Sequence, residues 1–315
     1  MPVHSATPVV LFVRQADRDG DSPVTAPLQN CSPRGKQPMV FIRSKFSSGE
    51  FVSLTADTYV GKSMQLYGEW SYGEIEAIGQ FVGQDSNVVE VGSNIGSHTA
   101  FIARDLCPNG RIFAFEPRRV LFQILCTNMI LNDITNVDAR QCAVGEKSST
   151  LHERVMDLET EDNFGALALG SQDGDGEEIR IVTLDSLLDC LPKIQLLKAD
   201  VEGHELAVLK GAHDLLTRDR PVLYVENDRI DLSQQLMSHI SSLNYSMYWH
   251  FVSLFRPDNF AGEKENIFGG TISCNLLCLP DELAMGVDGL DLVDDLSYHP
   301  LSKFQHGQTP MGSLE

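Results

Sequence analysis

The sequence has few basic residues and no long apolar run, and both absences narrow the classes of partner. It holds 24 Lys and Arg against 44 Asp and Glu, for a formal net charge of −20 at pH 7. Such a surface repels nucleic acid and anionic lipid, because both bind through Lys and Arg that displace counterions. The apolar stretch at 9–13 is too short to span a membrane and lacks the basic segment that precedes a signal-peptide core. We therefore expect no nucleic-acid partner, no membrane association and a cytoplasmic location.

The seven cysteines include no CxxC pair. Cys274 and Cys278 are four apart in a strand-like run at 272–280, a spacing that puts both on one face. No histidine or further cysteine lies near them in the sequence, so we interpret them as buried thiols and not as zinc ligands. This cysteine usage fits a reducing compartment.

The 315 residues are enough for one enlarged domain, and their composition divides the chain into four segments. Residues 1–38 are rich in polar residues and proline and predict a flexible N-terminal arm. Residues 39–84 predict a hairpin, with strands at 40–43 and 51–54, and then a helix at 74–82. Residues 85–285 form the predicted core, and 286–315 a C-terminal tail. No oligomeric state is predicted.

The core alternates short apolar runs with helical patterns, which predicts an α/β fold with a mostly parallel sheet and helices on both faces. Because the runs are continuously apolar, we expect strands that are covered on both sides. The predicted parallel strands are 88–91, 111–116, 138–144, 196–200 and 222–226. The predicted helices are 97–106, 118–131, 185–191, 205–216 and 232–243. Two further core strands are predicted at 245–249 and 273–279, and an inserted pair at 151–155 and 179–184 flanks a polar loop at 171–178.

The central motif runs from Val88 to Thr99 and reads VVEVGSNIGSHT. A strand leads into a turn with two glycines, and a helix follows, which is how nucleotide-like cofactors are bound at the carboxyl end of a first strand. A dinucleotide fingerprint needs a second glycine where Asn94 stands. Glu90 would repel a pyrophosphate but attract the ammonium and sulfonium of S-adenosylmethionine. Glu116 ends the second strand and can accept hydrogen bonds from both ribose hydroxyls.

Three other interpretations of this motif remain open. The two glycines can simply make a tight turn, with Ser97 capping the helix, and His98 and Thr99 are then ordinary first-turn residues. An NAD-dependent oxidoreductase would share the ribose-binding acid. A non-catalytic S-adenosylmethionine-binding protein would keep the fold without turnover.

Further motifs accompany the glycine turn: the Phe-Glu-Pro run at 115–117, Asn128 and Asn132, the Thr-Leu-Asp run at 183–185, LKADVEGHE at 197–205, LKGA at 209–212 and PVLYVEN at 221–227. In these motifs, over roughly residues 67–280, the sequence resembles the FkbM family of methyltransferases. The Asp-Val-Glu-Gly-x-Glu pattern at 200–205 is the most specific of these.

The resemblance implies the Rossmann-like class I methyltransferase fold with a seven-stranded sheet, and S-adenosylmethionine as methyl donor. It also implies methylation of a hydroxyl on a small-molecule acceptor, a sugar or a secondary metabolite. The residues predicted to bind the donor are Glu90, Gly92, Asn94, Gly96, Thr99, Glu116, Pro117, Ala143 and Asp200. Ala143 is a predicted wall of the adenine slot.

Acidic residues end the fourth and fifth predicted strands, where ligands of open α/β sheets bind. Asp200 and Glu226 are the predicted catalytic groups, and with Asn227 they offer oxygen ligands to Mg²⁺. His204 is a candidate general base, because the ordinary histidine pKa suits neutral pH. Helix capping by Asp200 is the alternative.

Three further features lack a unique interpretation. Lys198 lies in an apolar strand and needs a partner, for which Asp200 or Glu226 would serve. The aromatic segment at 67–72 suits stacking on a sugar ring or a lid over the cofactor. His250 can line the acceptor pocket or belong to a packed aromatic segment.

Overall fold

The computed structural model describes residues 40–46, 49–164, 176–283 and 286–304. The predicted arm at 1–38 lies outside the described residues, as do residues 171–175 of the predicted polar loop and 305–315 of the predicted tail. All the described residues belong to one compact unit, within which the statements below hold.

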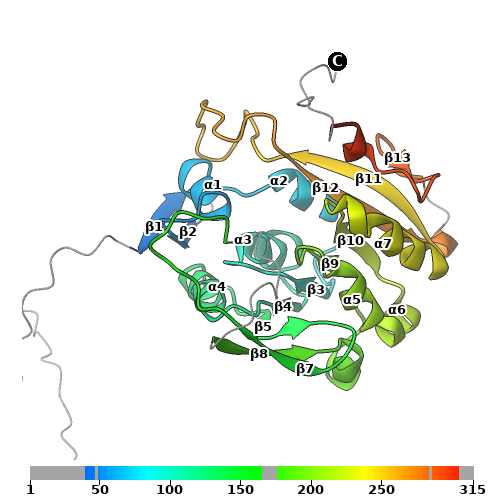
Figure 1. The fold of residues 1–315 in the computed structure, drawn as a ribbon. Helices are drawn as coiled ribbons and strands as arrows, with labels where there is room; N and C mark the ends of the chain where they lie inside the picture. Colours follow the sequence, from blue (N-terminus) through cyan, green and yellow to red (C-terminus); the bar gives the residue numbers. More distant parts are fainter. Residues whose placement is uncertain (1–39, 47–48, 165–175, 284–285, 305–315) are drawn as a thin grey trace, which may run out of the picture. The chain divides into compact units, whose positions relative to one another are not determined.

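An eight-stranded sheet forms the centre of this unit, in the order β13-β11-β12-β10-β9-β3-β4-β5 (Figure 1). The parallel strands are β3 (Val88–Val91), β4 (Ile112–Phe115), β5 (Val137–Arg140), β9 (Leu196–Ala199) and β10 (Val222–Glu226). The antiparallel strands are β11 (Tyr245–Ser253), β12 (Ile272–Pro280) and β13 (Asp291–Leu292). The seven predicted strands are all present, and the eighth, β13, comes from the segment predicted as a tail.

Alternate residues of the parallel strands pack on opposite faces of the sheet. Val89, Phe113 and Leu197 belong to one core cluster, which holds residues of α5 (Glu205–Lys210), α6 (His213–Asp219) and α7 (Ile230–Ser242). Val88 and Ile112 belong to a second cluster, with residues of α2 (Tyr72–Ile78), α3 (Ser97–Phe101) and the π-helix η1 (Ile102–Leu106). Both faces are covered, which confirms the Rossmann-like class predicted from the continuous apolar runs.

The N-terminal hairpin docks on the core through α4 (Arg119–Leu131). The hairpin consists of β1 (Phe41–Phe46) and β2 (Gly49–Leu54), in register from Phe41 opposite Leu54, and leads into a helix that was not predicted, α1 (Val60–Leu66). Asn128 of α4 accepts the N–H of Val52 at 2.7 Å and donates to its carbonyl at 3.0 Å. Asn132 makes the same pair of bonds with Glu50, at 3.0 and 2.7 Å. The two asparagines thus act as a backbone partner for β2.

Two predicted elements are each split in the structure. The predicted strand at 138–144 divides into β5 and β6 (Ala143–Val144), and β6 leaves the main sheet to pair with β8 (Glu177–Val182). The inserted strand β7 (Ser149–Glu153) pairs with β8 as predicted, which completes a separate sheet.

The predicted helix at 205–216 divides into α5 and α6. Asp185 explains this break: its carboxylate accepts the N–H groups of Asp214 and Leu215, at 3.1 and 3.0 Å, and so caps the start of α6 from a distant segment. Thr183 instead caps the 3₁₀ helix η2 (Asp185–Cys190), by accepting the N–H of Ser186 at 3.1 Å.

Two shorter 3₁₀ helices, η3 (Asp281–Leu283) and η4 (Pro300–Phe304), complete the elements. No helix within the described ranges is both long and apolar enough to cross a membrane. Cys274 and Cys278 are buried free thiols, as predicted.

Candidate active site

A polar cavity lies at the carboxyl ends of the neighbouring strands β3 and β9. From β3 the chain adds β4 and β5 on one side, and then adds β9 and β10 on the other side, so the order of the strands changes direction between β3 and β9. Such a reversal opens a crevice in doubly wound sheets, and here it holds a cavity of about 360 Å³. Six of the predicted donor-binding residues line it: Glu90, Gly92, Asn94, Glu116, Pro117 and Asp200.

The glycine turn after β3 forms the edge of this cavity. Gly92 has φ 87°, and a Cβ on it would lie 1.8 Å from the carbonyl oxygen of Asp200. A side chain at this position would therefore separate β3 from β9. Gly96, at φ 81°, begins α3 and lies against Leu125. Gly96 and Thr99 line neither this cavity nor the apolar pocket described below. They belong to the structure of the turn and of α3, and do not face the cavity.

Glu90 is almost wholly buried, with 1% of its surface exposed. Its Oε2 accepts the hydroxyl of Thr99 at 2.5 Å. Burial raises the pKa of Glu90 to about 7, although the nearby Lys198 ammonium opposes this rise. A cation brought into the cavity would return this carboxyl to its ionised form.

Glu116 reaches across from the end of β4. Its two oxygens accept the N–H groups of Asn94 and Arg118, each at 2.9 Å, which fixes the carboxylate beside the glycine turn. Burial raises the pKa of Glu116 to about 6. Each oxygen keeps a lone pair, and together they can accept two further donors.

An apolar pocket of about 170 Å³ adjoins the polar cavity and shares Gly92, Pro117 and Val201 with it. Ala143 lies in its wall, and the separate sheet supplies Leu151 and Ile181 as well. The two cavities together suit an elongated ligand with an apolar end and a polar, cationic end.

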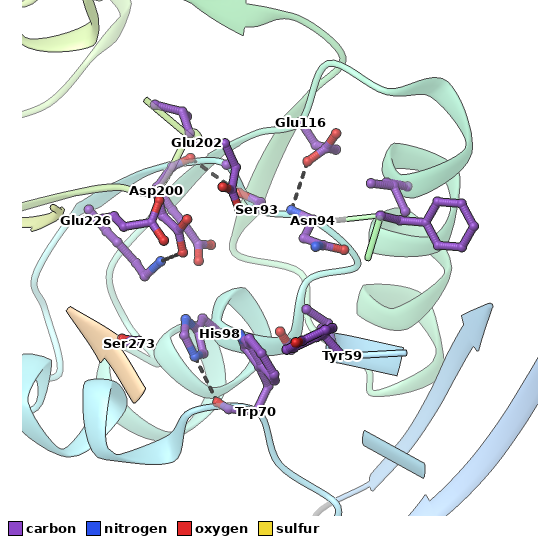
Figure 2. Close-up of a pocket in the computed structure, with 18 of the residues that line it drawn as sticks. Tyr59, Trp70, Ser93, Asn94, His98, Glu116, Asp200, Glu202, Glu226 and Ser273 are labelled. Atoms are coloured by element: carbon purple, nitrogen blue, oxygen red, sulfur yellow. Dashed lines mark hydrogen bonds and ion pairs between the residues drawn. The ribbon is translucent and has the colours of Figure 1, made fainter. Parts of the chain in front are cut away.

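Three carboxylates meet beyond Gly92. Asp200, Glu202 and Glu226 each place an oxygen within 4.8 Å of the others. Burial, and then the charge of Asp200, raise the pKa of Glu202 to about 7 and that of Glu226 well above its usual range. Figure 2 shows these three side chains together on one side of the cavity.

Asn227 does not line the polar cavity, although it was predicted to join the carboxylates as a metal ligand. Its N–H donates to the carbonyl of Cys274, and its carbonyl lies 2.8 Å from Nε2 of His299. These contacts hold the end of β10 against β12 and the C-terminal segment. Glu202 is the third carboxylate beside Asp200 and Glu226.

Lys198 is 1% exposed and forms an ion pair with Asp200, at 3.0 Å, as predicted. Its second acidic neighbour is Glu74 of α2, at 3.9 Å, and not the predicted Glu226. Parallel registers place Lys198 beside Glu90 on β3 and beside Tyr224 on β10, so it faces the side of the sheet that α2 and α3 cover.

His98 also lines the polar cavity, although the sequence suggested only a first-turn helix residue. Its Nε2 lies 2.9 Å from the carbonyl oxygen of Trp70, and Figure 2 shows the ring between Trp70 and the side of the cavity that holds Asp200. Trp70 is the one member of the aromatic segment 67–72 that lines the cavity. Tyr67 is instead tied by its hydroxyl to the backbone of Glu265 and Ile267.

The two other histidines considered from the sequence lie elsewhere. His204 lines the apolar pocket and not the polar cavity. His250 accepts or donates a 2.7 Å hydrogen bond with the hydroxyl of Tyr224 and lines a separate surface groove. The strand positions of Tyr224 and His250 could not reveal this pairing, because it depends on β12 lying between their strands.

The chain is similar in sequence to known methyltransferases. Residues 90–247 match the model of the methyltransferase FkbM domain. Methyltransferase 1 of Beauveria bassiana is 29% identical over 149 residues, which cover 41% of this chain and 59% of that protein. The hexuronic acid methyltransferase AglP of Haloferax volcanii is 29% identical over 135 residues, covering 42% of this chain and 52% of that protein.

Among solved structures, methyltransferase FkbM from Methylobacillus flagellatus aligns at 17% identity and a TM-score of 0.38, over 62% of this chain and 44% of that one. The sequence matches to Methyltransferase 1 and to AglP span little more than half the length of each of those two proteins. On the match over residues 90–247, the chain belongs to the methyltransferase FkbM family.

Proposed function

We propose that this protein transfers a methyl group from S-adenosylmethionine to a hydroxyl oxygen of an uncharged small molecule, such as a sugar or a secondary metabolite. The observation that carries the proposal is the pair of joined cavities, one apolar and one acidic, around a glycine turn flanked by Glu90 and Glu116. Family membership supports the reaction class.

The donor fits the residues that are present. Adenine is flat and largely apolar, which suits the pocket with Pro117 and Ala143 in its wall. The ribose hydroxyls suit the remaining acceptor positions of Glu116. The ammonium and sulfonium suit the acidic cavity beside Glu90, where a pyrophosphate would meet carboxylates instead of a row of backbone N–H groups. NAD is therefore the poorer ligand.

The charges of the polar cavity favour an uncharged acceptor. Its lining holds the acidic residues Glu74, Glu90, Glu116, Asp200, Glu202, Glu226 and Asp228, against the basic residues Arg118, Lys198 and Arg229. Arg229 is already paired with Glu202 and Asp228. The name of AglP assigns it a hexuronic acid, but a carboxylate acceptor would be repelled here.

Asp200 and Glu226 remain the predicted groups on the acceptor side of the cavity. Replacement of Asp200 by Asn should lower turnover by at least about 100-fold, because Lys198 loses its closest counter-ion, and should affect donor binding far less than turnover. Unchanged turnover would remove Asp200 from the mechanism. We do not assign the role of base to His204, because it lines the apolar pocket.

The Mg²⁺ site stays a prediction. Asp200 and Glu226 do come together, with Glu202 as third carboxylate, and such oxygens fit a hard cation. Treatment with a chelator, followed by readdition of Mg²⁺, decides its part in turnover. A loss restored by Mg²⁺ supports the site, and full activity with chelator excludes a catalytic metal.

The proposal is tested by donor binding and by product formation. Calorimetric titration should give binding of S-adenosylmethionine and none of NAD, and Glu116→Gln should weaken the former. Labelled methyl groups should then pass to uncharged acceptors, with methyl α-D-glucopyranoside and D-glucuronate as a matched pair of sugars. Binding of NAD alone would favour an oxidoreductase. Donor binding without methylation of any acceptor class would favour a non-catalytic binding protein.

A further inference from the structure

Three ionisable side chains from three separate elements meet at the buried side of the polar cavity. Glu74 comes from α2, His98 from α3 and Lys198 from β9, with 3%, 4% and 1% of their surfaces exposed. All three line the cavity, so a ligand inside it can reach them. None of them was predicted as a site residue.

Glu74 is held rigidly, yet one of its oxygens lacks a hydrogen bond. Its Oε1 accepts the hydroxyls of Ser71 and Ser273, each at 2.8 Å. Its Oε2 is buried and has no hydrogen-bond partner among the described residues. This oxygen lies 4.0 Å from Nδ1 of His98 and 3.9 Å from Nζ of Lys198. A buried carboxylate oxygen without a partner is costly, so the arrangement indicates a position for a bound polar group.

The hydrogen bond to Trp70 determines which nitrogen of His98 carries the proton. A backbone carbonyl can only accept, so Nε2 donates to it and Nδ1 keeps a free lone pair in the neutral ring. Burial lowers the pKa of His98, and the Lys198 ammonium lowers it further. Glu74 of α2, the backbone carbonyl of Trp70 before α2, and Asp200 after β9 oppose this effect.

We propose that His98 is the general base of the methyl transfer and that Glu74 is its positioning residue. The proposal rests on the function proposed above. The acceptor hydroxyl occupies the position beside Oε2 of Glu74, donates its proton to Nδ1 of His98 and receives a hydrogen bond from Lys198. The new oxygen–carbon bond forms as the methyl–sulfur bond of the donor breaks, and that electron pair stays on sulfur. The proton on His98 then passes to solvent.

The neighbouring carboxyls are less suited to accept the proton. Asp200 is engaged by the Lys198 ammonium at 3.0 Å. Glu202 is paired with Arg229, and burial raises the pKa of Glu226 well above its usual range, which favours the protonated form of this group. His98 is neutral at pH 7, and the imidazolium that it becomes has the Glu74 carboxylate as neighbour.

The state of His98 is tested without any acceptor. In protein labelled with ¹⁵N-histidine, the ring of His98 should show a bare Nδ1 and a protonated Nε2 at pH 7, and should titrate below the ordinary histidine pKa. Glu74→Gln should lower that pKa further, because the imidazolium loses its carboxylate neighbour, while the amide oxygen can still accept from Ser71 and Ser273. A protonated Nδ1 at pH 7 would overturn the proposal.

Turnover is tested with His98→Gln, whose amide can still donate to the Trp70 carbonyl. With methyl α-D-glucopyranoside as acceptor, kcat should fall by about 100- to 1,000-fold, while the Kd of S-adenosylmethionine changes less than about threefold. The acid limb of the pH–rate profile should disappear. The matched control is His250→Gln, a histidine outside the cavity, which should keep wild-type kcat.

The outcomes separate this proposal from the proposed function. If wild type methylates the sugar and His98→Gln does so within about fivefold, His98 is not the base and the function stands. If wild type binds no S-adenosylmethionine, the proposed function fails. If it binds the donor but leaves the sugar unmodified, the acceptor class is wrong, and the NMR titration still decides the state of His98.

Discussion

Glu90 is the residue whose charge matters most for a cationic donor. Because its pKa is raised to about 7, the carboxyl is largely protonated at pH 6 and largely ionised at pH 8. A cation binds the ionised form better, so the affinity for S-adenosylmethionine should rise with pH across this range. Calorimetry over the range should show about a tenfold change.

The matched variant is Glu90→Gln, which preserves the bond with Thr99. It should bind the donor about 10- to 100-fold more weakly and lose the pH dependence. Equal affinity for the donor in wild type and variant would remove Glu90 from the binding site.

Individual residues of the candidate site could be predicted where the sequence itself places an acidic residue at the end of a predicted strand. Glu90, Glu116 and Asp200 were predicted in this way, and all three line the cavity. Glu74 and His98 were not, because their proximity depends on two helices covering one face of the sheet. Neither has a neighbour in the sequence that signals its role.

At the scale of elements, the hairpin is held to the core by asparagine side chains. Asn128 is fully buried and bonds Val52 and the carbonyl of Ile95 in the glycine turn. Asn128→Ala leaves these backbone groups without partners and should lower the free energy of unfolding by about 3 kcal/mol. It should also weaken donor binding, since Ile95 lies in the turn.

Asn132→Ala is the matched control for this variant. Asn132 makes an equivalent pair of bonds but is partly exposed, so water can replace it, and we expect a loss of about 1 kcal/mol. Urea denaturation measures both. Equal losses for the two variants would contradict a role for burial.

Helices and strands could be predicted where their hydrophobic pattern extends over many residues, but the residues at which they end and the elements with which they pair could not. The sequence at 138–144 has no feature that shows where the chain leaves the main sheet. The chain leaves the main sheet there because Ala143 and Val144 pair with β8, which is distant in sequence. Asp185 likewise caps α6 rather than its own helix, a contact that local spacing cannot predict.

At the scale of the whole molecule, the buried acids tie stability to pH. Glu90, Glu202 and Glu205 have pKa values raised to about 7, and that of Glu226 is raised well above its usual range, in each case chiefly by burial. The folded state therefore binds more protons than the unfolded state between about pH 4.5 and about pH 7. Stability of the ligand-free protein should fall as pH rises through this range, and the midpoint of thermal unfolding should decrease from about pH 5 to about pH 7.5.

Glu226→Gln should raise this midpoint at about pH 8 by at least about 2 °C, because one of the buried carboxyls, which ionises more easily in the unfolded state, is then absent. Glu282→Gln is the opposite case. Its hydrogen bond with Arg220 lowers the pKa of the exposed Glu282 to about 2, so its replacement should leave the midpoint unchanged or slightly lower. A lower midpoint for Glu226→Gln at pH 8 would show that this carboxyl stabilises the fold.

The central claim is that the acidic glycine turn holds the methyl donor, and a crystal structure with S-adenosylhomocysteine tests it most directly. We predict adenine beside Pro117 and Ala143, the ribose hydroxyls on Glu116 and the amino group in the acidic cavity. A ligand bound elsewhere, with Glu90 and Glu116 turned away from an empty glycine turn, would contradict the account.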